Sequence, residues 1–122
     1  MLILDAVLSD RGSKYAVSGT PCRTAAEAQA VVADLCRTKK FARATHHSWA
    51  LVSSADGPLK NDDGEAGAGM VILRMLERAG LSDHVVVVTR WYGGKPLGGD
   101  RFRHVQTAVR AYLDALAKGG GA

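Results

Sequence analysis

Hydrophobic residues recur along the chain with two spacings, one typical of helices and the other typical of strands. After Thr24, apolar residues follow at intervals of three and four, which places them on one helical face: Ala28, Val31, Val32, Leu35 and Cys36. Thr24 and Glu27 have the spacing of a capping box, which begins such a helix. Similar patterns predict two more helices, one from Gly67 to Ala79 and one that is capped by Asp100.

Four stretches have the alternation or the short apolar runs expected of strands: Leu2 to Leu8, Lys14 to Gly19, His47 to Ser53, and Val85 to Tyr92. The last stretch begins with four consecutive valines, a run that indicates burial on both faces of a sheet or nearly so. We therefore expect it to be an interior strand. The segment 56–64 lacks an apolar pattern, and we interpret it as a long loop of a kind that is often functional.

The order of these elements, ββαβαβα, predicts an α+β domain. We expect a two-layer α/β sandwich, with three helices on one face of a four-stranded mixed sheet and the other face uncovered. The 122 residues fit one domain. We assign residues 1–118 to it and the Gly-rich residues 119–122 to a flexible tail.

Charge and cysteine content narrow the class of protein only slightly. The 16 basic and 12 acidic residues give a net charge of +4 and a pI of about 9.3, which favours an anionic partner such as RNA but is equally typical of a soluble protein. Cys22 and Cys36 are too few for a disulfide framework, so we expect reduced thiols and a cytoplasmic location. No apolar stretch approaches transmembrane length, and the N-terminus lacks the pattern of a signal peptide.

An acidic motif, Asp62-Asp63-Gly64-Glu65, precedes the second predicted helix. The carboxylates repel one another, which indicates a reason for their proximity. They could cap the helix and complement its dipole, contact a partner, or ligate a divalent metal. We expect at least one of Asp63 and Glu65 to serve binding rather than stability, because one N-cap cannot use three carboxylates.

A glycine-rich segment joins the valine strand to the last helix, and this layout binds phosphate in other proteins. Arg90, Lys95, Arg101 and Arg103 could pair with an anion there. The alternative is a tight turn that needs glycine only for steric reasons. Two of these cations, Arg101 and Arg103, fall in the first helical turn, where the helix dipole disfavours them. That placement favours a function in anion or acidic-partner binding.

A basic segment, Arg37 to Arg43, contains one aromatic residue and is followed by His46 and His47. It is compatible with nucleic-acid binding, although a solvated helix end is the simpler interpretation. The two histidines are adjacent on a strand and should point to opposite faces. No serine or cysteine has a neighbouring base, so nucleophilic catalysis has no support.

Three ordered motifs resemble those of the IMPACT/YigZ family, over about Ser13 to Ala117. They are Ala44-Thr45-His46 with Trp49-Ala50, then Asp62-Asp63-Gly64-Glu65, and then Val86 to Gly94 with Leu97-Gly98. The continuation Asp100-Arg101-Phe102 with His104 is similar to the eukaryotic branch in particular. The resemblance implies a fold similar to domain IV of the ribosomal translocase, and a role in translational control.

Eukaryotic members of that family restrain the starvation-activated kinase of a translation initiation factor by competing for the kinase's activator, and are described as binding actin. An RWD domain contributes to the activator contact in those members, and nothing in this sequence resembles one. The resemblance therefore implies a link to translation, with a kinase-activator protein as one candidate partner.

From the residues and the resemblance together we expect a non-enzymatic binding module linked to the regulation of translation. Its partner would be a protein of the translation apparatus or the ribosome and its RNA, with no cofactor, no metal and no membrane. The predicted binding surface consists of His46, Asp62, Asp63, Glu65, Arg90, Tyr92, Gly93, Gly94, Lys95, Asp100, Arg101 and Arg103. The alternatives are a small metal- or phosphate-dependent hydrolase that uses the acidic motif, and an adaptor that binds protein through an uncovered sheet face.

Overall fold

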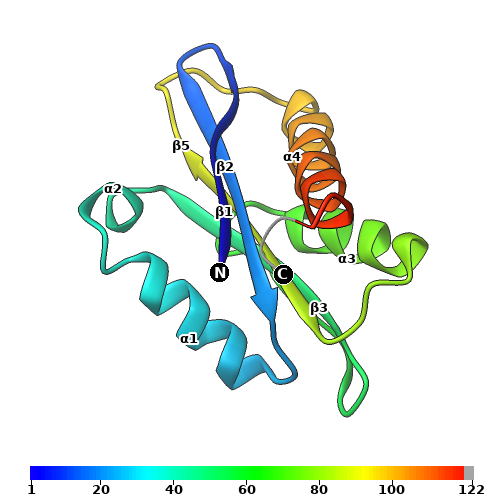
Figure 1. Cartoon of the computed structure of the whole chain (residues 1–122). Coiled ribbons are helices and arrows are strands. Elements are labelled where there is room, and N and C mark those ends of the chain that lie inside the picture. Colours follow the sequence, from blue (N-terminus) through cyan, green and yellow to red (C-terminus); the bar gives the residue numbers. More distant parts are fainter. Residues whose placement is uncertain (120–122) are drawn as a thin grey trace.

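The computed structural model describes residues 1–119. In these residues five strands form a single sheet, and four helices pack against it (Figure 1). In chain order the elements are β1 (Leu2–Asp10), β2 (Ser13–Pro21), α1 (Ala25–Leu35), α2 (Lys39–Ala42), β3 (His46–Ser53), β4 (Gly57–Asn61), α3 (Ala68–Ala79), β5 (His84–Trp91) and α4 (Asp100–Ala117). The α+β class is confirmed. Of the tail predicted at 119–122, all but Gly119 lies outside the described residues.

The strands lie in the order β1-β2-β5-β3-β4, and every neighbouring pair is antiparallel. The valine strand β5 lies at the centre between β2 and β3, as predicted. The prediction of a mixed sheet is wrong. Each helical crossover joins two parallel strands, but those two strands are not neighbours in the sheet. The strands that α1 joins, β2 and β3, run parallel but have β5 between them, and β4 and β5 likewise have β3 between them.

The two faces of the sheet are covered by different helices (Figure 1). Val86 and Val88 pack with residues of α3 and α4, whereas Val85 and Val87 pack with residues of α1 and α2. The prediction of three helices on one face is therefore wrong. A strand of four buried valines needs cover on both sides, and α1 and α2 supply it on the second face. The prediction of an uncovered sheet face is therefore also wrong.

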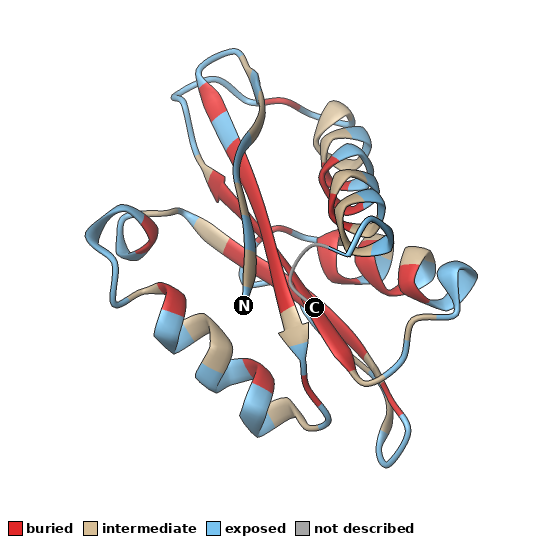
Figure 2. Ribbon diagram, in the orientation of Figure 1, coloured by how far each residue is buried: buried red, intermediate tan, exposed pale blue. Residues whose placement is uncertain are grey.

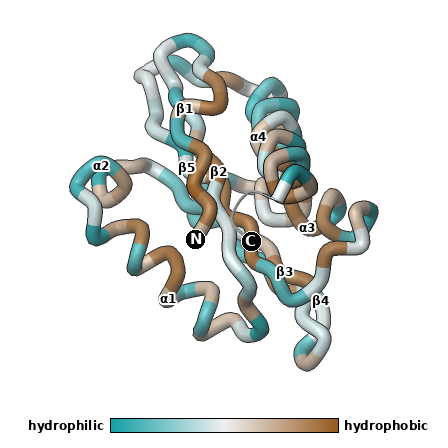
Figure 3. Tube along the Cα trace, in the orientation of Figure 1, coloured by the Kyte–Doolittle hydropathy of each residue, from teal (hydrophilic) through white to brown (hydrophobic). Residues whose placement is uncertain are grey.

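The helices are amphipathic, with hydrophobic and hydrophilic positions alternating along α1 and α4 (Figure 3), and buried positions concentrate on β2, β3 and β5 (Figure 2). Thr24 caps α1 as predicted, since its Oγ1 accepts a hydrogen bond of 3.1 Å from the amide of Glu27. The Glu27 carboxylate accepts from the amide of Arg23 and not from that of Thr24, so only half of the predicted capping box is formed. Of the helices in residues 1–119, none is both long and apolar enough to span a membrane.

The strand β4 occupies part of the segment predicted as a loop, which raises the predicted strand count of four to five. Among the strands of residues 1–119 it pairs with β3 alone, and it contains Pro58. An edge strand tolerates proline because one side of its backbone has no ladder hydrogen bonds to donate. With a single apolar side chain, Leu59, this short strand has no alternation from which it could have been recognised.

The turn between β1 and β2 lies against the end of β5. The amide of Gly93 donates a hydrogen bond of 3.1 Å to Ser13 Oγ, and a Cβ at Gly93 would lie 2.1 Å from the carbonyl carbon of Gly12. Only glycine permits this approach. The contact fixes the place where β5 leaves the sheet, and the candidate site lies at that end.

Candidate binding site

A buried ion pair forms the base of the site. Nη1 of Arg90 donates a hydrogen bond of 2.7 Å to Oε1 of Glu65, and only 7% and 4% of the two side chains are exposed. Nη2 of Arg90 lies 3.4 Å from Ser13 Oγ. The guanidinium also lies over the rings of Tyr15 and Tyr92, 5.8 and 5.6 Å from their centroids. These contacts on several sides hold Arg90 in one position.

Two further basic side chains surround the Glu65 carboxylate. Nε2 of His46 lies 3.2 Å from Oε2, and Nε of Arg101 lies 4.0 Å from Oε1. His46 Nδ1 is 2.7 Å from the carbonyl oxygen of Asp63. A carbonyl oxygen only accepts, so Nδ1 carries a proton, and this bond fixes the orientation of the ring.

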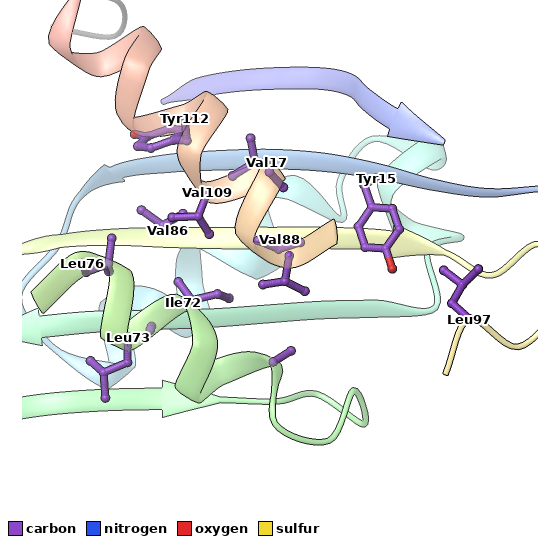
Figure 4. Close-up of a cluster of buried hydrophobic side chains, with 14 residues drawn as sticks. Tyr15, Val17, Ile72, Leu73, Leu76, Val86, Val88, Leu97, Val109 and Tyr112 are labelled. Atoms are coloured by element: carbon purple, nitrogen blue, oxygen red, sulfur yellow. The ribbon is translucent and has the colours of Figure 1, made fainter. Parts of the chain in front are cut away.

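These side chains line a pocket of about 400 Å³ at the end of β5 and the start of α4. Its other lining residues come mainly from the turn before α4: Gly64, Tyr92, Pro96, Leu97, Gly98, Gly99 and Phe102. Leu97 and Tyr15 also lie together at one end of the core cluster behind the pocket (Figure 4). The pocket therefore has a charged base and a partly apolar wall.

Several polar atoms at this site have no hydrogen-bond partner among residues 1–119, although they are buried. They are Nε of Arg90, Nε of Arg101, the hydroxyl of Tyr15, and Oε2 of Glu65, which lies 3.2 Å from Nε2 of His46 without a hydrogen bond. Buried polar atoms are nearly always paired, so such a group of unpaired atoms is typical of a functional site. The lining contains two guanidinium groups and one carboxylate, which leaves one positive charge in excess before His46 is counted.

The three carboxylates of the acidic motif point to three different partners. Asp62 accepts hydrogen bonds of 3.0 and 2.8 Å from the amides of Gly67 and Gly69. Burial alone would raise the pKa of Asp62, but these bonds and the nearby Lys60 hold that pKa below its usual value. Oδ2 of Asp63 accepts a 2.7 Å hydrogen bond from the amide of His47.

Asp62 thus orders the entry to α3, Asp63 ties the loop to β3, and Glu65 alone faces the pocket. Over residues 1–119, no three histidine, cysteine, aspartate or glutamate side chains are grouped so that they could hold a metal ion. The geometry of the carboxylates gives the alternative of a metal-dependent hydrolase no support.

Backbone amides at the start of α4 donate hydrogen bonds to carbonyl oxygens of the turn that precedes the helix. The amides of Asp100, Arg101 and Phe102 donate to the carbonyls of Leu97, Gly98 and Gly99, at 3.1, 3.4 and 3.2 Å. Asp100 is the first residue of the helix, and the N-cap is Gly99, without a side-chain cap. The predicted cap by Asp100 is therefore wrong, and the helix N-terminus offers few free amides to a phosphate group.

The two arginines in the first turn of α4 lie beside nearby carboxylates, which offsets their unfavourable interaction with the helix dipole. Arg101 faces Glu65, and Arg103 lies 3.4 Å from Asp100. Asp100 also accepts a hydrogen bond of 2.6 Å from Arg11. Asp100 and Arg103 lie outside the pocket lining, as do Gly93, Gly94 and the exposed Lys95.

Five residues of the predicted surface thus meet in the pocket: His46, Glu65, Arg90, Tyr92 and Arg101. The apolar wall of Pro96, Leu97 and Phe102 was not predicted as part of the site. Leu97 and Phe102 belong to the motifs that carried the family resemblance, and that was the only signal for them. The two adjacent histidines point to opposite faces as expected, because the side chain of His47 contacts Thr89 and Phe41 in the layer below α1.

The fold and the pocket define a class of small α+β domain with a charged pocket where the central strand meets the last helix. A family model described as the Impact N-terminal domain matches residues 11–113, and the chain therefore belongs to the IMPACT family. The family resemblance read from the motifs is confirmed.

Protein IMPACT from Bos taurus is 35% identical over 111 residues, which cover 87% of this chain and 35% of the relative. Protein IMPACT from Homo sapiens is 33% identical over 111 residues, with the same two coverages. An IMPACT family member of Saccharomyces cerevisiae is 54% identical over 59 residues, which cover 48% of this chain and 33% of the relative. The chain thus spans about a third of the length of these curated relatives.

Two solved structures share the fold. A crystal structure described as a hypothetical protein matches with a TM-score of 0.75 and 24% identity, over 93% of this chain and 60% of that chain. The structure of Yih1, described as a two-domain translational regulator, matches with a TM-score of 0.53 and 28% identity, over 91% of this chain and 44% of that chain.

Proposed function

We propose that the chain is a non-enzymatic binding module that acts in the regulation of translation and holds an acidic group of its partner in the pocket beside Arg101. Membership of the IMPACT family and the likeness to a translational regulator support the link to translation. The observation that carries the binding role is the excess positive charge of a pocket whose buried Arg90 and Glu65 retain unpaired polar atoms, judged over residues 1–119.

A binding role fits the local chemistry better than catalysis. A general acid or base needs a side chain that is free to exchange a proton with a substrate. Asp62 and Asp63 hold backbone amides instead, and Glu65 is enclosed by Arg90, Arg101 and His46. The same contacts argue for a rigid recognition pocket, since each charged group is held by at least one neighbour.

The partner we propose belongs to the translation apparatus, and a kinase-activator protein remains one candidate within that class. A cytoplasmic location is part of the same proposal. The free thiols of Cys22 and Cys36 are compatible with a reducing compartment.

Capture from a cell lysate tests this function. The tagged chain should enrich ribosomal proteins or translation factors, and enrichment that survives ribonuclease treatment indicates a direct protein contact. Arg101→Ala should reduce the capture several-fold. Arg103→Ala is the matched control, because it removes the same charge from the same helix turn outside the pocket. Equal capture by the two variants, or no enrichment of translation components, would contradict the proposal.

A further inference from the structure

We infer that the acidic group received by the pocket is the side-chain carboxylate of a glutamate or aspartate in a protein partner. This inference rests on the proposed function, because it names the chemistry of the group that the binding module holds. Three features of the pocket carry it: its charge, its depth and the charges at its rim.

The charge of the lining matches a single monoanion. Arg90 and Arg101 provide two positive charges against the one negative charge of Glu65. Arg90 is committed to Glu65, whereas the side chain of Arg101 is 35% exposed. The Arg101 guanidinium lies 5.0 Å from the centroid of the Phe102 ring. It is therefore held at the mouth, where it can pair with a carboxylate in the fork geometry that favours arginine.

The depth of the pocket favours a group at the end of a side chain. The charged base is more than nine-tenths buried, and Pro96, Leu97 and Phe102 form the wall around it. A carboxylate on one or two methylenes can enter such a space, and its methylenes can contact the apolar wall. A phosphodiester has a sugar on each side, so both sugars would have to enter the pocket before the phosphate could reach its charged base.

The rim carries charges of both signs, most of them already paired. Asp100, adjacent to Arg101, is paired with Arg11 and Arg103, and the Asp63 carboxylate accepts a hydrogen bond from the amide of His47. Cations that are already paired attract the successive phosphates of RNA less than free cations would. A protein segment can instead place one acidic side chain in the pocket and polar residues against these pairs. Mixed charge of this kind gives specificity in protein–protein contacts.

A nuclear magnetic resonance titration of the ¹⁵N-labelled chain tests the inference directly. The probes are N-acetyl-glutamate N-methylamide, the matching glutamine compound, and dimethyl phosphate, at equal ionic strength. The glutamate probe should cause saturable shifts at the Arg101 Nε–H and at the amides of Gly98 and Gly99. Arg101→Ala should weaken its affinity roughly tenfold, or about 1.4 kcal/mol. Arg103→Ala should leave the affinity unchanged, and the spectra of both variants report whether the fold is intact.

Three outcomes would overturn the carboxylate pocket: no saturable shift with the glutamate probe, equal shifts with the glutamine probe, or stronger shifts at the same atoms with dimethyl phosphate. The lysate capture separates this failure from that of the proposed function. Probe binding without capture of translation components would reject the proposed function and support the pocket. Capture that depends on Arg101 without carboxylate binding would support the function and reject the pocket chemistry.

Discussion

Arg90 and Glu65 form a hydrogen-bonded ion pair with a 2.7 Å separation and almost no solvent exposure. Removal of one partner from a buried pair leaves an uncompensated charge, so Glu65→Ala should lower the free energy of unfolding by about 3–5 kcal/mol. Urea denaturation measures this change. Glu77→Ala is the control, because Glu77 pairs with Arg74 at the surface, and its loss should cost less than about 1 kcal/mol.

Replacement of both partners by apolar residues of similar size should recover most of the stability that Glu65→Ala loses, because no unpaired charge then remains. The double variant Glu65→Leu with Arg90→Met provides that comparison. A similar loss for Glu65→Ala and Glu77→Ala would mean that the buried pair contributes little to the folded state. The burial of Glu65 gives this carboxylate a structural role in addition to the binding role that the sequence suggested.

Gly93 should tolerate no side chain, because its Cα faces the backbone of the β1–β2 turn. A Cβ there would lie 2.1 Å from the carbonyl carbon of Gly12 and 2.3 Å from the amide nitrogen of Ser13. Gly93→Ala should therefore lower the free energy of unfolding by about 1–3 kcal/mol. Gly99→Ala in the same loop is the control, since its Cβ would meet no atom within 4 Å. Thermal unfolding that shifts equally for both variants would contradict the close approach.

The sequence allowed accurate prediction where one local pattern determines one structure. Four consecutive valines predicted the central strand, and Thr24 predicted a helix N-cap whose hydrogen bond to the amide of Glu27 is present. The sheet order could not be read in this way. No local pattern specifies that β5 lies between β2 and β3, the two strands that α1 joins. Strand order depends on pairing between residues that are far apart in the sequence.

The candidate site was predictable in its charged residues and in His46 and Tyr92, but not in its apolar wall. Glu65 was recognised because three carboxylates lie within four residues, and Arg90 and Arg101 because they flank a glycine-rich turn of a kind that binds anions. The convergence of their side chains on one another depends on the antiparallel pairing of β3 with β5, which sets His46 opposite Arg90. The individual roles of Asp62 and Asp63 were not separable from sequence, since each accepts hydrogen bonds from amides whose positions only the folded loop defines.

The buried contact between His84 and Tyr112 should limit stability at both ends of the pH range. Their side chains meet at 2.6 Å. Burial lowers the pKa of His84, so the unfolded chain binds the proton first, and stability should fall as the pH decreases below about 6.5. Burial raises the pKa of Tyr112 to about 12, so the unfolded phenol ionises first, and stability should fall as the pH rises above about 10.

Melting temperatures between acidic and alkaline pH measure both limits. His84→Gln should make the decline below about pH 6.5 shallower, because the variant has no group to protonate at this position. Tyr112→Phe should reduce the alkaline decline without abolishing it, since burial also raises the pKa of Tyr15 to about 12. An acidic decline of equal slope in wild type and His84→Gln would assign the effect to other groups.

Asp62 should stabilise the entry to α3 in the manner of a helix cap. Its carboxylate accepts hydrogen bonds from the amides of Gly67 and Gly69, and Gly67, the N-cap of α3, has no side chain with which to do so. Asp62→Ala should therefore cost about 1 kcal/mol. Asp62→Asn should retain only part of that contribution, because its one amide oxygen can accept from Gly67 or Gly69 while its NH2 group cannot accept from the other. Asp56→Ala is the matched control, since Asp56 is exposed in the β3–β4 turn.

Urea denaturation of the three variants, at neutral pH and again near pH 3, separates capping from a general charge effect. Hydrogen bonds from Gly67 and Gly69 hold the pKa of Asp62 below its usual value against the opposing effect of burial. The contribution of the carboxylate is therefore complete above the unfolded pKa of about 3.9, and protonation removes it as the pH falls further. The difference between wild type and Asp62→Ala should accordingly shrink in acid. A difference that is the same at both pH values, or equal losses for Asp62→Ala and Asp56→Ala, would mean that the Asp62 carboxylate does not hold the start of α3.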